Sequence, residues 1–561
     1  LRCIEGLPGF QRIPEALLLY TKEHSCLIVL ILQNLSLEIS TVYKGHSIAA
    51  SMILCSVLLC QDHHRIILMA GCTTDTADHL ASMSHRYSLQ IPLHGMSSVK
   101  SKQVIISVKK IQFCGHHLVH IDFLTALIAD IDASCSFRYP LEAGETFYAP
   151  EVILSYTDQG MNRLSQNLHS CIRHHICRGK YKTEVRPVLV NSWEAAYFDF
   201  TGETLYNLAK EAKSLGIDML VLDDGWFGKR DDDNSGLGDW YVNEKKLGET
   251  LGGLVKRVNE IGVKFGIWIE PEMISEDSDL YREHPDWALT IPGRKPVRSR
   301  NQLVLDFSRK EVVDGIFGQI SAVLDNANIE YVKWDMNRSL MDVFSVMTKD
   351  QGRVMYDYVL GLYDFLDRMV NRYPDLLIEG CSGGGGRFDA GTLYYTPQIW
   401  CSDNSDAIDR LRIQYGTSFG YPVSAMGAHV SAVPNHQTGR ITPLHTRGVV
   451  AMSGTFGYEL DLLKLTEEEK DEVRSQIGEF RKYAPLIQNG RYYRLTDPFK
   501  SEICAWEIVG NSQEEVLLNV VMEEIHGNMT VNYVQLRGLD ESALYKEQAT
   551  GKIYSGAALM H

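Results

Sequence analysis

Carboxylates and tryptophans gather where short apolar runs of this sequence end. These groups are Trp193–Glu194, Asp223–Trp226, Trp268 with Glu270 and Glu272, Asp306, Lys333–Arg338, Glu379 with Cys381, and Cys401–Asp403. Acyl transfer usually uses Ser or Cys beside His, and metal-assisted hydrolysis usually uses His clusters. Glycoside cleavage needs one carboxylate that stabilises positive charge and one carboxylic acid that protonates the leaving oxygen, while tryptophan faces suit the C–H faces of a sugar. The residue types therefore favour chemistry on a sugar.

The segment 331–338 carries the sharpest signal. Asp335 ends an apolar run and Lys333 lies two residues before it, so in a strand both side chains point to the same face. A neighbouring ammonium lowers the pKa of a carboxyl group and keeps it ionised, as a nucleophile requires. A structural ion pair at the rim of a barrel explains the same spacing equally well.

Asp223 and Asp224 are adjacent at another strand end. Neighbouring side chains alternate across a strand, so both can face inward only where the strand breaks. We favour a pair of acceptors for sugar hydroxyls over a cap for the following helix. A calcium site is a weaker option, because the nearby Asp231–Asp233 run is typical of a solvated loop.

Asp403 and Asp406 are candidates for the proton donor. Asp403 is slightly favoured because it lies nearer the strand end, and Asp406 could cap the next helix or take the same role. Three rival carboxylates are more often supporting or rim residues: Glu270, Glu272 and Glu379. His429 and His436 are interpreted as hydrogen-bonding loop residues rather than metal ligands, and no metal or cofactor is expected.

The elements that must position these groups alternate from residue 184 onward. Eight apolar runs are predicted strands: Val185–Trp193, Ile217–Trp226, Val263–Glu272, Leu303–Ser308, Tyr331–Asn337, Leu376–Cys381, Gln398–Asp403 and Pro422–Val430. Predicted helices lie between them: Gly202–Leu215, Leu251–Ile261, Lys310–Asn328, Gly352–Arg372, Asp406–Tyr415 and His445–Met452. Eight parallel strands covered by helices predict an α/β fold, a closed (β/α)8 TIM barrel, with Asp335 and Asp403 after the fifth and seventh strands.

Two further regions flank the barrel. Residues 1–183 predict a shortened, β-rich N-terminal domain, with strand-like stretches such as Gln103–Val108 and Phe147–Tyr156. The barrel is expected over 184–487. An acidic helix (Thr466–Tyr483) then leads to Pro485, and 488–561 alternates like a small antiparallel β-domain. The glycine run 383–386 follows a late strand and lacks the Lys-Ser/Thr of a P-loop, which disfavours nucleotide binding.

Composition limits the partners. The net charge is −16, and this surface disfavours nucleic acid and anionic membranes. Two apolar runs, 26–32 and 48–60, are shorter than the ~20 residues of a membrane-spanning helix. No basic segment followed by an apolar core opens the sequence, and a cytoplasmic protein is expected. None of the twelve cysteines has CxxC spacing, which argues against zinc ribbons and thioredoxin chemistry. A chain this long does not need disulfides to fold, so reduced thiols are expected.

Eight strings resemble the bacterial-type α-galactosidases of glycoside hydrolase family 36. They are NSWEAAYFDF (191–200), LVLDDGWFG (220–228), FGIWIEPEM (265–273), RNQLVLD (300–306), YVKWDMNR (331–338), IEGCSGGGGRFD (378–389), WCSDNSDAIDRLRIQYGTS (400–418) and GAHVSAVPNHQTGR (427–440). The resemblance covers about residues 145–555. Only about half of the family's usual N-terminal length precedes Val185, and residues 1–140 match the family poorly.

The resemblance implies a retaining double displacement, with Asp335 as nucleophile and Asp403 as acid/base. The two carboxyl groups should then lie about 5–5.5 Å apart. It implies that Asp223, Asp224 and Lys333 hold the galactose hydroxyls. Other pocket positions match as well: Trp193, Trp268, Arg300, Asn337, Cys381 and Gly384.

The implied substrates are α-galactoside oligosaccharides of the melibiose and raffinose type, and a homo-oligomer is possible. A related α-N-acetylgalactosaminidase or α-galactosyl transferase is an alternative, although Cys381 and the glycine run favour an unsubstituted sugar O2. A non-catalytic carbohydrate-binding remnant is a third interpretation, because the N-terminal region departs from the family pattern.

Overall fold

The computed structural model describes residues 151–524 and 533–561 continuously. Before residue 151 it describes nine short strands, Ala143 and Phe147. These strands are β1 (Leu18–Lys22), β2 (Ser25–Val29), β3 (Glu38–Ile39), β4 (Ala50–Ser51), β5 (Arg65–Ile67), β6 (Gly71–Cys72), β7 (Leu89–Gln90), β8 (Lys102–Ser107) and β9 (Ser136–Leu141). The apolar run 26–32 lies partly in β2, and the apolar run 48–60 lies mostly outside the described residues. No helix in the described part of the chain is long and apolar enough to cross a membrane.

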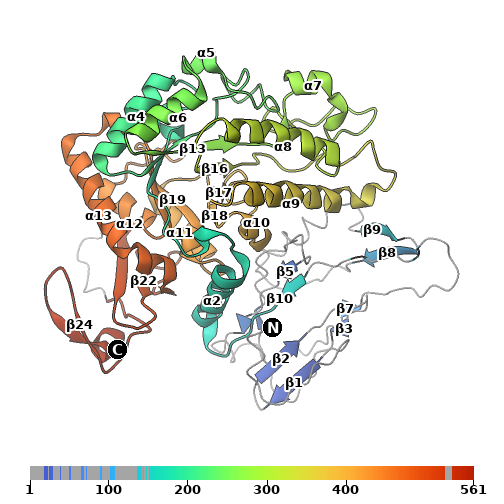
Figure 1. Cartoon of the computed structure of the whole chain (residues 1–561). Coiled ribbons are helices and arrows are strands. Elements are labelled where there is room, and N and C mark those ends of the chain that lie inside the picture. The colour runs from blue at the N-terminus through green and yellow to red at the C-terminus, as the bar shows by residue number, and fades with distance from the viewer. Residues whose placement is uncertain are drawn as a thin grey trace.

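Eight parallel strands form a closed barrel at the centre of the described structure (Figure 1). In order around the barrel they are β11 (Leu189–Asn191), β12 (Met219–Leu222), β13 (Lys264–Ile269), β16 (Tyr331–Trp334), β17 (Leu377–Gly380), β18 (Gln398–Trp400), β19 (Met426–Ser431) and β20 (Thr455–Glu459). Nearly every residue of these strands is buried, as expected for a parallel sheet covered by helices. The predicted TIM barrel is confirmed.

One predicted barrel strand was wrong and one was missed. The run 303–308 contains only the two-residue β15 (Leu303–Val304), which pairs antiparallel with β14 (Met273–Ile274) outside the barrel. The eighth barrel strand is instead β20, whose pairing with β11 closes the ring. Asp335 therefore follows the fourth barrel strand and Asp403 the sixth, not the fifth and seventh.

The helices that cover the barrel begin and end close to their predicted positions. They are α4 (Gly202–Leu215), α6 (Leu251–Glu260), α8 (Lys310–Asp325), α9 (Val354–Arg372), α11 (Ala407–Thr417), α12 (Leu444–Ala451) and α13 (Glu467–Asn489). Thr201 caps α4 through a hydrogen bond from the Thr204 backbone, and Gly262 adopts the left-handed conformation just after α6. The prediction for α13 was too short, because this helix continues past Pro485 to Asn489.

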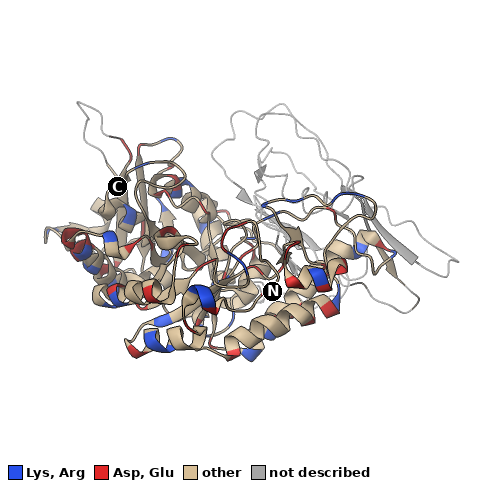
Figure 2. Ribbon diagram, turned by 90° about the horizontal axis from the view of Figure 1, so that it is seen from above, with Lys and Arg blue, Asp and Glu red and all other residues tan. Residues whose placement is uncertain are grey.

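The other α-helices of the described residues are α2 (Gly160–Cys171), α3 (Trp193–Ala196), α5 (Glu244–Leu247), α7 (Asp279–Glu283), α10 (Ala390–Tyr395) and α14 (Gly556–Met560). The strand β10 (Glu151–Ile153) precedes α2 and lies within the predicted strand-like stretch Phe147–Tyr156. Figure 2 shows basic and acidic residues interspersed along the outer helices.

The C-terminal region is an antiparallel sheet, as predicted. It contains β21 (Arg491–Arg494), β22 (Ile503–Val509) and β23 (Val516–Met522), followed by a hairpin of β24 (Leu544–Lys546) and β25 (Ile553–Ser555). One face carries a small core of its own around Val509, Leu536 and Tyr545. Trp506 on β22 donates a hydrogen bond to Ser453 beside β20, which ties this sheet to the barrel.

Candidate active site

Asp335 lies directly after β16, buried and surrounded by hydrogen-bond donors. The Oδ2 atom accepts from Trp268 Nε1 at 3.1 Å and from Asn337 Nδ2 at 2.8 Å. The Oδ1 atom accepts from the backbone N–H groups of Met336 (2.8 Å) and Gly383 (3.2 Å). Burial raises the pKa of Asp335, but the charge of Lys333 and the hydrogen bonds to the carboxylate outweigh it, so the pKa lies below its usual value. The arrangement favours an ionised Asp335.

Lys333 holds a second buried carboxylate in place. Its Nζ atom lies 3.0 Å from Asp223 Oδ2, and that oxygen also accepts from Asn191 Nδ2 at 2.6 Å. Burial lowers the pKa of Lys333, but the charges of Asp223 and Glu459 raise it well above its usual range. Lys333 thus forms an ion pair with Asp223 and lowers the pKa of Asp335 through its charge. It therefore combines the structural ion pair and the activation of a nucleophile, the two interpretations of the Lys333–Asp335 spacing.

Asp224 points into a different environment from its neighbour Asp223. Arg230 binds it in a two-pronged contact, with nitrogen–oxygen distances of 2.8 to 3.2 Å, and both side chains are buried. Burial raises the pKa of Asp224, while Arg230 acts in the opposite direction. Asp223 and Asp224 therefore face the same end of the barrel with separate partners, and neither caps a helix.

Asp403 follows β18 and packs against the glycine run. A Cβ atom on Gly384, which has a φ of +82°, would lie 2.7 Å from the Asp403 backbone nitrogen. A Cβ atom on Gly385 would lie 2.4 Å from the Cys401 carbonyl oxygen. Only glycines permit this close approach, which brings the loop after β17 against the segment that carries Asp403.

The pKa values of the two candidate catalytic carboxyl groups are shifted in opposite directions. Burial raises the pKa of Asp403, and the negative charge of Asp335 raises it further. Asp335, in contrast, is held in its ionised form by Lys333 and its donors. Pairs whose environments separate their pKa values are typical of acid/base assignments.

Aromatic rings line this end of the barrel. Trp268 is buried and stacks on Phe227, with 6.2 Å between ring centroids and 12° between planes. Trp193, in α3 just after β11, is partly exposed and contacts Tyr197 and Phe198 edge-on. The structure places both predicted tryptophans at the carboxyl ends of barrel strands.

The remaining predicted residues join the same network. Arg300 NH1 donates to Asn337 Oδ1 at 3.0 Å, and Asn337 in turn donates to Asp335. Burial raises the pKa of the Cys381 thiol, as does the charge of Asp335, so this side chain stays a neutral thiol. The structure thus links Arg300, Asn337 and Cys381 to Asp335.

The rivals considered from the sequence have other partners. Asp406 caps α11 by accepting from the backbone of Ile408 and Asp409 at 3.0 Å. Glu272 accepts from Trp334 Nε1 (3.0 Å) and Tyr358 OH (2.7 Å) away from Asp335. Both carboxylates are therefore held by structural partners.

Two further acidic residues lie near the site, and only one of them, Glu194, was named from the sequence. Glu459, at the end of β20, is buried against His429 at 3.2 Å and influences both Lys333 and Asp403. Glu194 accepts from Ser405 at 2.7 Å, and His436 Nδ1 lies 3.1 Å from it. Glu459 was not predicted because the strand β20 was not predicted. Glu194 was named beside Trp193, but its distant partners could not be predicted from the sequence.

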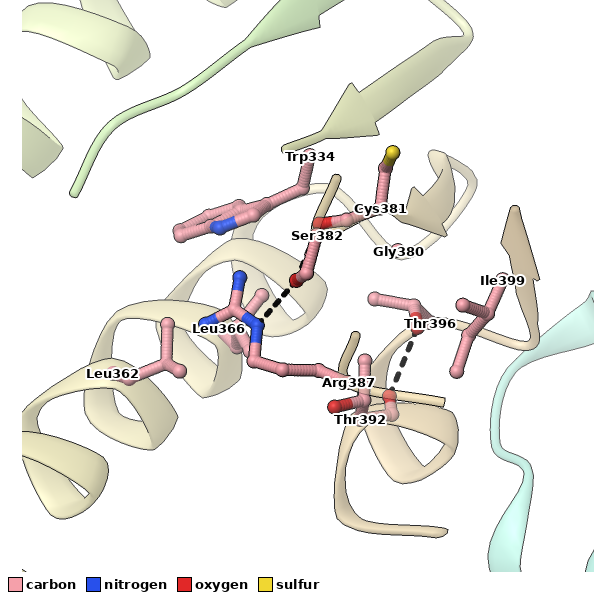
Figure 3. A pocket seen from close by; sticks show the side chains of 10 residues that line it. All are labelled: Trp334, Leu362, Leu366, Gly380, Cys381, Ser382, Arg387, Thr392, Thr396 and Ile399. Carbon is pink, nitrogen blue, oxygen red and sulfur yellow. Dashed lines mark hydrogen bonds between the residues drawn. The ribbon is translucent and has the colours of Figure 1, made fainter. Parts of the chain in front are cut away.

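A small cavity lies behind the site, between β17 and the helices α9 and α10 (Figure 3). Its volume is about 10 Å³, which is room for about one water molecule. Arg387 donates to Ser382 Oγ at 2.6 Å there, and the sulfur of Cys381 points away from Arg387. The cavity is too small for a sugar.

Comparison with known families gives two matches along this chain. The family described as Melibiase matches residues 146–490, and the one described as Glycosyl hydrolase family 36 C-terminal domain matches residues 503–561. Together they cover the barrel and the C-terminal sheet.

Curated relatives are similar over three quarters of the chain or more. The "Bifunctional alpha-galactosidase/sucrose kinase AgaSK" of Mediterraneibacter gnavus is 66% identical over 425 residues, covering 76% of this chain and 45% of the relative. "Alpha-galactosidase AgaA" of Geobacillus stearothermophilus is 49% identical over 454 residues, covering 80% of this chain and 62% of the relative. The chain thus spans about half to three fifths of their length.

Solved structures agree with these matches. The galactosidase domain of AgaSK has a TM-score of 0.74 at 66% identity, covering 76% of this chain and 58% of that one. The crystal structure of AgaA has a TM-score of 0.75 at 50% identity, covering 76% and 59%.

Proposed function

This chain belongs to the melibiase family of glycoside hydrolases, and from that premise we propose that it is a retaining α-galactosidase. Its substrates would be oligosaccharides with a terminal, non-reducing α-D-galactosyl residue. Support comes from structures of AgaA variants bound to raffinose and to stachyose, proteins 50% identical to this chain. The observation that carries the proposal is the pair of aspartates with opposite electrostatic environments, Asp335 and Asp403.

Asp335 is the proposed nucleophile. Its carboxylate attacks the anomeric carbon and forms a covalent glycosyl ester as the bond to the leaving oxygen breaks. Lys333 keeps the carboxyl group ionised, and the donors Trp268 and Asn337 fix its orientation. A water molecule then cleaves the ester, so that the sugar leaves with its original anomeric configuration.

Asp403 is the proposed acid/base. In the first step it protonates the leaving oxygen, and in the second it removes a proton from the attacking water. Burial and the Asp335 charge raise its pKa, which favours the protonated form that the first step needs. Once Asp335 is esterified its charge is gone, so the pKa of Asp403 falls and suits the second role.

The sugar hydroxyls would be held by acceptors and donors around the barrel mouth. Asp223 and Asp224 accept hydrogen bonds from the sugar hydroxyl groups, and Lys333 donates a hydrogen bond to a sugar hydroxyl group. The other proposed contacts are Trp193, Trp268, Arg300, Asn337, Cys381 and Gly384. Asp224 is suited to this role because Arg230 fixes its carboxylate plane.

Hydrolysis of p-nitrophenyl α-galactoside by the purified chain tests the proposal. We expect turnover of this substrate, with little of the α-glucoside or of the N-acetylgalactosaminide. Preference for the N-acetyl substrate would favour an α-N-acetylgalactosaminidase. Sugar binding without turnover would favour a carbohydrate-binding remnant.

We also propose three units, 1–183, 184–487 and 488–561, an α-galactoside oligosaccharide as partner, and a cytoplasmic homo-oligomer. The family matches, 146–490 and 503–561, support the boundary near 487, while the first match begins before residue 184. Size-exclusion chromatography with light scattering tests the assembly.

A further inference from the structure

The loop that presents Asp335 is held by a side chain where strand pairing stops. The strands β13 and β16 pair Trp268 with Lys333 and Ile269 with Trp334. The Asp335 backbone N–H still donates to the Ile269 carbonyl oxygen at 2.8 Å. Two residues later the two strands separate, and the Asn337 backbone N–H donates to Glu270 Oε1 instead of to a backbone carbonyl. The carboxyl group of Glu270 thus replaces the next carbonyl of the ladder.

Three hydrogen bonds, one of them to Glu270, hold Asn337 in place. Its backbone N–H is held by Glu270, its Oδ1 accepts from Arg300, and its Nδ2 donates to Asp335 Oδ2 at 2.8 Å. Glu270 Oε1 also accepts from Gln302 Nε2 at 2.9 Å, two residues beyond Arg300. One carboxyl oxygen therefore joins the loop after β13 to the loop after β16.

The other oxygen of Glu270 has no such role. Glu270 is fully buried, and Oε2 lacks a hydrogen-bond partner among the described residues. Burial and the neighbouring Asp335 charge raise the pKa of Glu270 to about 8, although Asn337 and Arg230 act in the opposite direction. An ionised Glu270 would place a second, poorly solvated negative charge beside Asp335.

Resting on the proposed function, we propose that Glu270 is a positioning residue that acts as a neutral carboxylic acid. It holds Asn337, and through Asn337 it orients the Asp335 carboxylate and Arg300. Glu270 does not touch the reacting atoms. Ionisation of Glu270 would disturb this geometry, because repulsion between the two carboxylates would displace the loop that carries Asp335.

Two substitutions at one position separate this role from simple packing. Glu270→Gln keeps an oxygen that accepts from Asn337 and Gln302, but it cannot ionise. Glu270→Ala removes the acceptor. The matched control is Glu507→Gln in the C-terminal sheet. Glu507 is also fully buried, accepts a backbone N–H from Arg537 at 2.6 Å, and has its pKa raised by burial to about 7.

The first measurement is the pH dependence of kcat/KM on α-galactosyl fluoride, whose leaving group needs no proton from Asp403. We expect the wild-type rate to fall above about pH 8, and Glu270→Gln to lose this alkaline decline while keeping kcat near neutral pH. Glu270→Ala should lower kcat roughly 100-fold, because the nucleophile is misplaced. Glu507→Gln should retain the wild-type profile. An unchanged decline in Glu270→Gln, or full kcat in Glu270→Ala, would overturn the inference.

A second measurement does not depend on turnover. The infrared difference spectrum between the wild type and Glu270→Gln should contain the stretching band of a protonated carboxyl group at pH 6.5. That band should fade with a midpoint near 8. If the wild type fails to hydrolyse the fluoride, the proposed function fails, and this band still decides the state of Glu270. Its absence at pH 6.5 would overturn the inference.

Discussion

The hydrogen bond from Trp268 to Asp335 can be removed while its ring is largely kept. Trp268→Phe deletes the Nε1–H that donates to Asp335 Oδ2 at 3.1 Å, and the remaining ring can still pack against Phe227. A hydrogen bond to a charged group contributes about 1.5–3 kcal/mol. Because one pKa unit corresponds to about 1.4 kcal/mol, the pKa of Asp335 should rise by about one to two units.

The assay is kcat/KM for p-nitrophenyl α-galactoside from about pH 2.5 to about 7, a window that extends below the ordinary Asp pKa. The wild-type acid limb should lie below 3.8, since the pKa of Asp335 is lowered from that value. In Trp268→Phe the limb should move up by one to two units, while the rate at neutral pH changes far less. Trp506→Phe, which loses a donor to the neutral Ser453 hydroxyl, is the control and should keep the wild-type limb. An unmoved limb in Trp268→Phe would refute the electrostatic reasoning.

Two further substitutions test the neighbours of the aspartates. Gly384→Ala places a Cβ atom 2.7 Å from the Asp403 backbone nitrogen at a φ of +82°, so kcat should fall at least tenfold. The control is Gly248→Ala, which has a φ of +77° and open space around it and should lower only the stability. Equal losses of kcat in the two variants would contradict this prediction. Arg230→Met leaves Asp224 buried without its cation, so the free energy of unfolding at pH 7 should drop by about 3–5 kcal/mol in urea titrations. The loss should shrink toward pH 4 as Asp224 takes up a proton, and a loss independent of pH would count against the buried ion pair.

Much of the barrel could be predicted because parallel strands buried on both faces are short apolar runs. The same property explains the error at 303–308. That segment is buried and apolar, but the pattern does not tell which sheet a buried run joins, and β15 pairs outside the barrel. Strand β20 was missed because its five residues, Thr455–Glu459, include a glycine and polar ends although all are buried.

Residues of the candidate site could be predicted where a reactive side chain lies directly at the end of a strand. Asp335, Asp403 and the Asp223–Asp224 pair are such cases. The roles of the supporting carboxylates were not, because they depend on contacts between distant segments. Glu194 meets Ser405, 211 residues away, and nothing local in the sequence indicates that contact.

Covalent trapping tests the central claim most directly. A 2-fluoro-galactosyl fluoride slows the second step, so the glycosyl ester should accumulate on the nucleophile. We predict that peptide mass spectrometry finds the label on Asp335, that Asp335→Ala takes up none, and that hydrolysis first releases α-galactose. A label on Asp403 or any other residue, or first release of the β-anomer, would contradict the mechanism.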